Sequence, residues 1–278
     1  MDLYSVKRPR YDLYEMELIG DPSCAIAVPA AAPDDLKRTV MAALKAHSLG
    51  YRSVDYVLRV YGSQWTFPPP EEGRAFLLRT LRAAESVVDN IDEHYSHGTV
   101  RPDHVGLFAA EMALARLKPT FRSAMLLIMQ GYPFEASAMC RIILEQYGYS
   151  YAVFKINDTE KILKVKASKT ITNLKRLLPY AGKVYGYLSS HSHLDPKDVR
   201  HYTVMREGVP CVRFALPEKI KPVVYYFLRL VVDFRTVVQE ISGEYLQLKQ
   251  LYEDSFILRQ DHDRITKAIS ALEKEVAM

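Results

Sequence analysis

The feature that most constrains the fold is an almost uncharged stretch, residues 121–154, in which Gly131, Tyr132 and Pro133 separate two apolar segments. Glycine is favoured where a helix ends in a left-handed residue, and proline is favoured at the first position of a helix. The stretch therefore predicts two helices that fold back on each other, the second running from Pro133 to about residue 156. Segments so poor in charge need cover on most sides, so we expect them to form the centre of the core.

Helical patterns also occur on both sides of this hairpin. Apolar residues recur every three or four positions in several segments that begin with prolines, acids or polar caps. We expect these helices at residues 34–49, through residue 61, at 71–95, from 101 to 130 with a kink or break at Pro119, at 159–178, 180–192 and 222–252, and around Ile265.

Only one segment shows the alternation of a β-strand that we interpret as structure. Residues 201–206 and 209–215 alternate about Glu207 and Gly208, which predicts a β-hairpin. The predicted fold class is therefore all-α: a helical bundle with a small β-hairpin insertion near residues 201–215.

Two features of the first 70 residues predict a division of the chain. Residues 1–33 lack periodicity and are rich in alanine and proline, which is typical of a loosely ordered arm and offers a docking segment for a protein partner. Three consecutive prolines, residues 68–70, interrupt any helix because proline has no N–H and restricts the residue before it. We expect an N-terminal arm with short helices at 1–70 and a helical bundle domain at 71–278.

Composition narrows the class of protein but names no reaction. The 37 Lys and Arg residues against 33 Asp and Glu give a net charge of +4, which is too small to indicate nucleic-acid binding by bulk charge. The three cysteines have no CxxC spacing and no nearby histidine, so we expect no metal site, and no motif indicates a cofactor. The first residues lack the apolar core of a signal peptide, and no run approaches the roughly 18 apolar residues that span a bilayer. We expect a soluble, cytoplasmic protein without a membrane partner.

The best indication of a polar site lies inside the second apolar segment. Arg141 and Glu145 are the only charged residues between Glu135 and Lys155, and their spacing of four places them on one face of a helix. They could form a surface ion pair, but apolar neighbours on every side favour burial. A buried pair is retained either because it fixes the packing or because it serves a site. We expect both side chains to be largely buried and at least one to contact residues 185–193.

A second polar cluster comprises Tyr185, Tyr187, Ser189, His191 and His193. Two histidines two positions apart diverge on a helix, so His191 and His193 are not expected to share a metal ion. His193 either holds a helix end by a hydrogen bond or acts as a general acid or base. Ser189 lacks the GxSxG turn that exposes a nucleophile.

Lysines recur between Lys161 and Arg176 and could follow a phosphate backbone. Aromatic residues are not interleaved with them as a base-stacking groove requires, so we interpret this segment as a solvated face. The chain has no glycine-rich phosphate loop.

Two parts of the chain resemble a group of poorly characterised bacterial helical proteins related to the HEPN fold. The shared pattern, which covers roughly the central half of the chain, consists of a helix that ends in the turn at Gly131, a helix with Arg141-x-x-x-Glu145, and a later run with Tyr185, Leu188, Ser189 and His193. The resemblance implies a helical bundle, frequent dimerisation and, for many members, ribonuclease activity or a role in anti-phage defence. The HEPN ribonuclease signature is an arginine followed four to six residues later by a histidine. This chain lacks that signature, which weighs against RNA cleavage without a metal.

The sequence supports one hypothesis and two alternatives. We expect a cytoplasmic HEPN-like helical protein that is a non-enzymatic or cryptically active component of a bacterial defence or stress system. The first alternative is an RNA-cleaving enzyme in which Arg141 binds phosphate, Glu145 orients it and His193 transfers protons. The second is a sensor that holds a nucleotide or another small ligand in the same pocket. Its binding residues would be Tyr185, Ser189 and His191.

We also expect a homodimer. Residues 224–228 are apolar all round a long C-terminal helix, which requires cover on more than one side, and twofold dimers are the commonest assembly of soluble chains. The predicted interface is this helix or the face beside the β-hairpin.

Overall fold

The computed structural model describes residues 16–21, 24–30, 32–67, 72–96, 104–192, 203–206, 209–212, 216, 219–246 and 256–276. Contacts within the chain divide it into two compact units, Met1–Leu78 and Arg79–Met278, and the division falls within helix α3 (Glu72–Ser96). This point lies a few residues after the expected boundary at residue 70.

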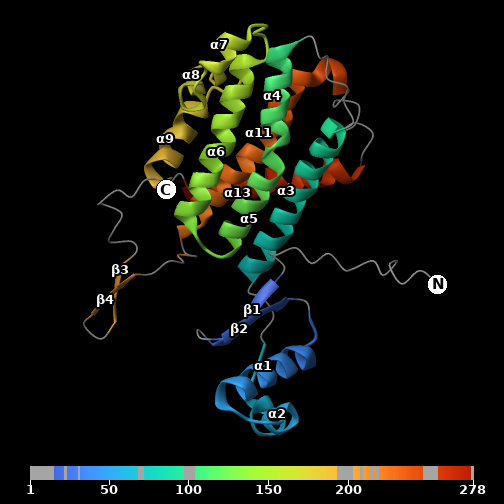
Figure 1. Ribbon diagram of the computed structural model, residues 1–278, viewed down its shortest axis with the longest axis vertical. Helices are drawn as coiled ribbons and strands as arrows, with labels where there is room; N and C mark the ends of the chain where they lie inside the picture. Colours follow the sequence, from blue (N-terminus) through green and yellow to red (C-terminus); the bar gives the residue numbers. More distant parts are fainter. Residues whose placement is uncertain are drawn as a thin grey trace, which may run out of the picture. The chain divides into compact units, whose positions relative to one another are not determined.

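The larger unit is a bundle of helices, which confirms the predicted all-α fold class (Figure 1). Besides most of α3, it contains α4 (Val105–Ala115), α5 (Leu117–Met129), α6 (Pro133–Val153), α7 (Thr159–Leu163), α8 (Ile171–Leu174), α9 (Ala181–Ser192), α11 (Lys221–Leu246) and α13 (Phe256–Val276). α13 runs crosswise to the others and packs on α11 (Figure 1). Among the described helices, none has an apolar run of the length that crosses a bilayer.

α6 is the central helix of this unit. It packs against α4, α5, α8, α9 and α11, and it buries Cys140, Ile143 and Tyr147 completely. Gly131 has a φ of 74°, a left-handed conformation that glycine adopts without a steric cost, and Pro133 is the first residue of α6. The predicted helical hairpin is therefore confirmed, with α5 and α6 as its two arms.

Aromatic side chains join α5, α6 and α11 in the core. The ring of Phe121 lies 5.4 Å from that of Phe234 and 6.0 Å from that of Phe227, while Tyr147 stacks on Phe234 at 6.0 Å. The Tyr147 hydroxyl is buried and donates a hydrogen bond to the carbonyl oxygen of Leu230 at 2.7 Å. Each buried ring of this size contributes about 1.5–3 kcal/mol through apolar burial, which explains why the least charged stretch of the sequence lies here.

The expected break near Pro119 is present. α4 ends at Ala115, four residues before Pro119. Pro119 is the third residue of α5, in the first turn, where its missing N–H needs no partner. On the outer side, Lys118 forms ion pairs with Asp89 at 3.2 Å and with Asp92 at 2.9 Å, and Arg122 forms one with Asp89 at 3.1 Å. These pairs connect α5 to α3 at the surface.

The single helix expected over residues 159–178 is wrong. Asp158 accepts a hydrogen bond from the Lys161 N–H and caps α7 as predicted, but α7 has only five residues. A 3₁₀ turn, Ala167–Lys169, and the short α8 follow it. Thr170 is buried between them and packs closely on Gly148, where a Cβ atom would lie 2.6 Å from its Oγ1. Residues 167–174 therefore follow the surface of α6 and do not continue α7 as one helix.

The predicted β-hairpin of the larger unit is confirmed. β3 (Thr203–Arg206) and β4 (Val209–Val212) pair antiparallel, and the flanking parts of the expected strands, residues 201–202 and 213–215, lie outside the described residues. Met205 is 66% exposed and Val209 is 60% exposed, so this two-stranded ribbon buries little of its own apolar surface.

The smaller unit contains a second hairpin that the sequence did not predict. β1 (Met16–Asp21) and β2 (Cys24–Pro29) pair antiparallel, so the expectation of a loosely ordered arm is wrong for residues 16–21 and 24–29. Ile19 and Val28 are buried, whereas Ile26 is 49% exposed. Lys37 connects the hairpin to the following helix, because its Nζ forms an ion pair with Glu17 at 2.6 Å. Residues 1–15 lie outside the described part.

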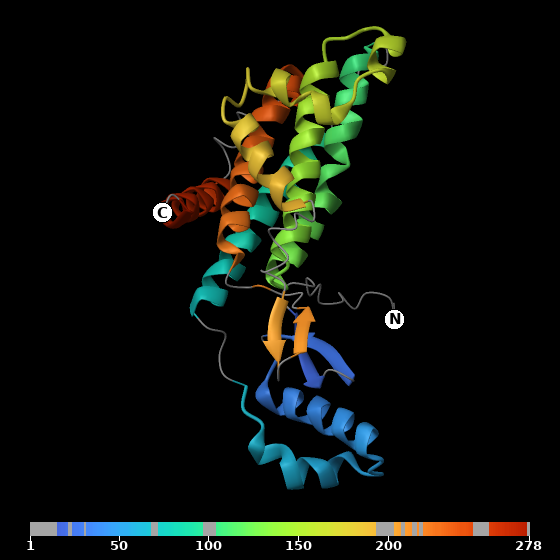
Figure 2. The same ribbon diagram turned by 90° about the vertical axis from the view of Figure 1, so that its left-hand side faces the viewer.

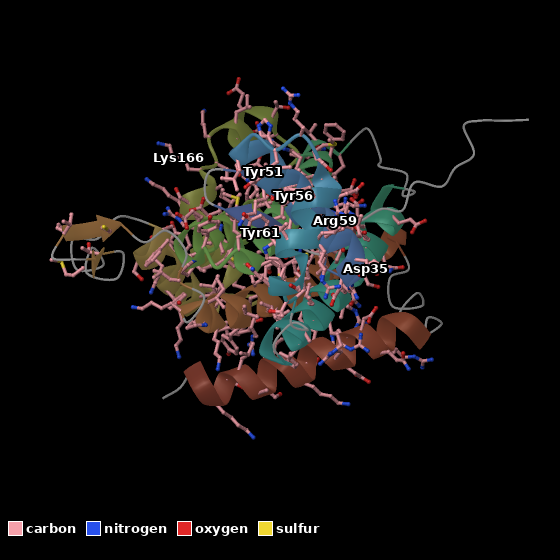
Figure 3. All side chains as sticks on the ribbon, turned by 90° about the horizontal axis from the view of Figure 1, so that it is seen from below. Asp35, Tyr51, Tyr56, Arg59, Tyr61 and Lys166 are labelled. Carbon is pink, nitrogen blue, oxygen red and sulfur yellow. The ribbon has the colours of Figure 1, made fainter. Side chains whose placement is uncertain are left out.

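Two helices complete the smaller unit, α1 (Asp34–Leu49) and α2 (Val54–Tyr61), both as predicted, and a 3₁₀ turn, Gly62–Gln64, follows them. Tyr51 and Tyr56 lie beside each other (Figure 3), with ring centroids 5.5 Å apart. The Nζ of Lys45 lies 4.2 Å from the ring centroid of Tyr61. A hydrogen bond with Tyr61 raises the pKa of Tyr51.

Candidate functional site

The structure brings the predicted polar residues of α6 and α9 together. Arg141 Nε donates to Glu145 Oε1 at 2.9 Å, and its terminal nitrogens donate to the hydroxyl of Tyr185 and to that of Ser192, each at 3.2 Å. The Tyr185 hydroxyl donates in turn to Glu145 Oε1 at 3.1 Å. We call these four residues the Arg141 cluster. The expected contact between the charged pair and residues 185–193 is confirmed.

The Arg141 cluster lies at the edge of the core. The side chains of Arg141 and Glu145 are 21% and 19% exposed, so they are mostly covered but still reach water. Partial burial acts to lower the pKa of Arg141, but the hydrogen bond and the charge of Glu145 outweigh it and raise that pKa. The guanidinium also lies 5.3 Å from the ring centroid of Tyr185, within the range of a cation–π contact.

The bonding within the Arg141 cluster determines what it can do chemically. One carboxylate oxygen of Glu145 accepts from two donors, and the guanidinium of Arg141 already binds three groups of this chain. A charged pair satisfied in this way is stable where it is and needs no ligand to neutralise it. The cluster is therefore well built to hold α9 against α6.

The remaining residues predicted for the site have separate environments. The ring of His191 stacks on Tyr187 at 4.1 Å and on Phe134 at 6.2 Å, and its Nδ1 lies 2.9 Å from the carbonyl oxygen of Tyr187. The carbonyl oxygen of Ser189 accepts a hydrogen bond from Ser192 Oγ at 3.2 Å. His193, the proposed acid or base, lies outside the described residues.

No metal centre is apparent in the part of the chain that the structure describes. No group of three or more His, Cys, Asp or Glu side chains gathers there in a way that could hold a metal ion. Cys140 is fully buried, and burial raises the pKa of its thiol. A thiol in that state is a core residue and not a nucleophile.

A second polar group, which the sequence analysis missed, joins α11 to Tyr180, the residue before α9. Asp233 is 4% exposed, and its Oδ1 accepts a hydrogen bond from the Tyr180 hydroxyl. The guanidinium of Arg229 lies 4.5 Å from the ring centroid of Tyr180. Burial raises the pKa of Asp233 to about 6, although the Tyr180 hydrogen bond and the charge of Arg229 act in the opposite direction.

A signal for this group was present in the sequence. Arg229 and Asp233 are the only charged residues from Val223 to Phe234, and they are four residues apart. The same pattern identified Arg141 and Glu145 in α6. Their partner Tyr180 could not be found in this way, because it precedes α9 by one residue and nothing local marks it as polar and buried.

Comparison of the chain with models of protein families, with curated proteins and with solved structures finds no match.

Proposed function

We propose that this protein is a non-enzymatic, HEPN-like helical protein that acts as a homodimer in the cytoplasm, as a component of a bacterial defence or stress system. The Arg141 cluster carries the non-enzymatic part of the proposal. A catalytic arginine and carboxylate need free hydrogen-bonding capacity for substrate, whereas here Arg141, Glu145 and Tyr185 bind one another. The HEPN-like and defence assignments follow from the resemblance of the sequence pattern.

The exposed surface of the β3–β4 hairpin supports self-association. Strand edges with unpaired N–H and C=O groups pair readily with another chain, and an isolated two-stranded ribbon is only marginally stable in water. Met205 and Val209 are both strongly exposed on this ribbon. A second copy that pairs along one of these edges would give a four-stranded sheet across a twofold axis.

The α11 interface expected from the sequence finds no support. Tyr226 is 8% exposed and Phe227 and Leu228 are fully buried, in a helix that packs on α4, α5, α6 and α13 of the same chain. The apolar face that required cover is therefore covered within the unit, which leaves the hairpin as the interface of the proposed dimer.

RNA cleavage is a second candidate function, and one observation favours it. Arg141 binds Ser192, and His193 is the next residue in the sequence. In this alternative Arg141 would bind the phosphate, Glu145 would orient it and His193 would transfer the proton.

Decay of labelled RNA with and without divalent metal distinguishes the two functions. We expect wild-type protein, the Arg141→Gln variant and the exposed-surface control Arg116→Gln to give the same background rate. A wild-type rate at least tenfold above that of Arg141→Gln, with Arg116→Gln equal to wild type, would overturn the non-enzymatic proposal in favour of the ribonuclease.

A further inference from the structure

Residues 155–183 hold more net positive charge than the whole chain. They contain eight Lys and Arg residues against two acids, a net charge of +6, whereas the complete sequence carries +4. All eight cationic side chains are exposed. Of these eight, only Lys161 has a carboxylate at ion-pair distance among the described residues, that of Asp158 at 3.3 Å. The positive charge of the protein is therefore concentrated on one segment and is largely unneutralised there.

The fold places this segment on one side of the larger unit. α7, the 3₁₀ turn Ala167–Lys169, α8 and the first turn of α9 follow one another on the side of the bundle that faces the viewer in Figure 2. α7 packs on α4 and α8 packs on α6, with Ile162 and Leu174 as buried residues. Because the apolar side chains of this segment face the bundle, its cations extend into water.

One apolar side chain departs from this arrangement. Leu163, the last residue of α7, is 80% exposed, and no other large apolar side chain in the described part of the chain is as exposed. Lys161 and Lys164 lie on either side of it in the sequence. A face of charged residues alone does not indicate a partner, but a leucine held outside the core among lysines is typical of segments that lie at a membrane surface. We call Leu163 and the eight cations of residues 155–183 the lysine surface.

The residue types of the lysine surface favour lipid over nucleic acid or protein. No aromatic residue occurs between Phe154 and Tyr180, so the segment offers no ring on which a base could stack. Seven of the eight cations are lysines, which are depleted in protein–protein interfaces and lack the planar fork by which arginine binds one phosphate or carboxylate in a fixed geometry. Attraction to a sheet of anionic headgroups needs charge but no fixed geometry.

We propose that the lysine surface binds the anionic lipid surface of a membrane, with its cations at the headgroups and Leu163 inserted among them. The expectation of no membrane partner rests on the lack of a spanning segment and of a signal peptide, and a surface contact needs neither. The lysine surface is separate from the Arg141 cluster, and the proposal does not depend on the proposed function.

Co-sedimentation of the full chain with lipid vesicles tests the proposal. One set of vesicles contains phosphatidylglycerol and phosphatidylcholine, and the other contains phosphatidylcholine alone. At about 0.1 M salt we expect the partition coefficient to be about tenfold or more higher on the anionic vesicles, and this preference should be lost at about 1 M salt, where charges are screened. Equal partition onto the two kinds of vesicle would overturn the proposal.

Charge variants locate the binding on the lysine surface. The double variant Lys164→Gln and Lys166→Gln should lower partition onto the anionic vesicles about tenfold, because each lysine near such a surface contributes up to about fivefold. The matched control, Lys267→Gln with Lys274→Gln, removes the same charge from exposed positions of α13 and should bind as wild type does. An equal loss in the two double variants, or no loss in the first, would overturn the proposal.

Leu163→Ser separates a lipid from a nucleic acid. It should lower partition onto the anionic vesicles about fivefold, because the inserted leucine is lost, and its circular dichroism spectrum should stay that of wild type, because the side chain is exposed. Leu49→Ser, a change of an exposed leucine in the smaller unit, is the control and should bind as wild type does. Unchanged vesicle binding by Leu163→Ser would overturn the proposal, and so would binding of single-stranded RNA at the lysine surface without binding of vesicles.

Discussion

Replacement of Asp233 by asparagine gives the sharpest test of the buried polar group formed by Tyr180, Arg229 and Asp233. Burial raises the pKa of this carboxyl to about 6, against an ordinary value of 3.8. In the pH range between these values the folded state binds more protons than the unfolded state, so stability falls as pH rises. A pKa difference of this size between the folded and unfolded states corresponds to a loss of about 3 kcal/mol in the free energy of unfolding. The loss is complete above about pH 6 and absent below about pH 4. Asp233→Asn cannot ionise, so it lacks this pH dependence.

The assay is urea unfolding of wild type and Asp233→Asn from pH 4 to pH 7, followed by far-ultraviolet circular dichroism. Fluorescence of Trp65 is unsuitable, because this residue lies in the smaller unit. We expect the free energy of unfolding of wild type, minus that of the variant, to fall by about 3 kcal/mol over this range. Tyr180→Phe removes a hydrogen bond that lowers the pKa of Asp233 in the folded state, so in that background the fall should begin at the same pH and extend to higher pH. A difference that stays constant across the range would refute the burial argument.

Two further predictions concern packing and assembly. Gly106→Ala should destabilise the protein by about 1–3 kcal/mol, because the added Cβ would collide with backbone oxygens at the end of α6. In the control Gly73→Ala the added Cβ meets open space, so this variant should not be destabilised. Equal midpoints of urea unfolding for the two variants would contradict this. Light scattering should give a mass of twice the 31.8 kDa of one chain for wild type. The double variant Met205→Lys and Val209→Lys should give the mass of one chain, because it places charges on the exposed hairpin. A mass of one chain for wild type across a dilution series would exclude the dimer.

The helices of the larger unit could be predicted because each carries its own local signal. Gly131 and Pro133 define the turn of the α5–α6 hairpin, and the spacing of apolar residues defines α3, α9 and α11. The failure at residues 159–178 has a tertiary cause. The position of Thr170 depends on its close contact with Gly148 of α6. The residues near Thr170 in the sequence do not show that contact.

The β1–β2 hairpin could not be predicted for a different reason. Its strands contain alanine, glycine and proline, and the regular alternation of apolar with polar residues that identifies a half-buried strand is missing. Its stability depends on contacts with α1, such as the ion pair between Lys37 and Glu17. The sequence of the strands alone does not show a contact with a residue of the next helix.

The candidate site was predictable in part. Two charges four apart in an apolar helix identified Arg141 and Glu145, and the polar run of α9 supplied Tyr185. The role of Ser192 as a partner of Arg141 depends on how α9 rotates against α6, which the sequence does not show. The pocket lined by Tyr180, Tyr225 and Glu273 was missed because α9, α11 and α13 contribute its residues from distant parts of the chain.

The Arg141 cluster couples α6 to α9 as a structural link. A double-mutant cycle with Arg141→Gln and Tyr185→Phe measures this coupling directly, through the free energies of unfolding of wild type, both single variants and the double variant. The hydrogen bond of 3.2 Å between Arg141 and the Tyr185 hydroxyl predicts a coupling energy of about 1 kcal/mol, the usual net contribution of such a bond. Additive losses, with a coupling energy below about 0.3 kcal/mol, would contradict the claim.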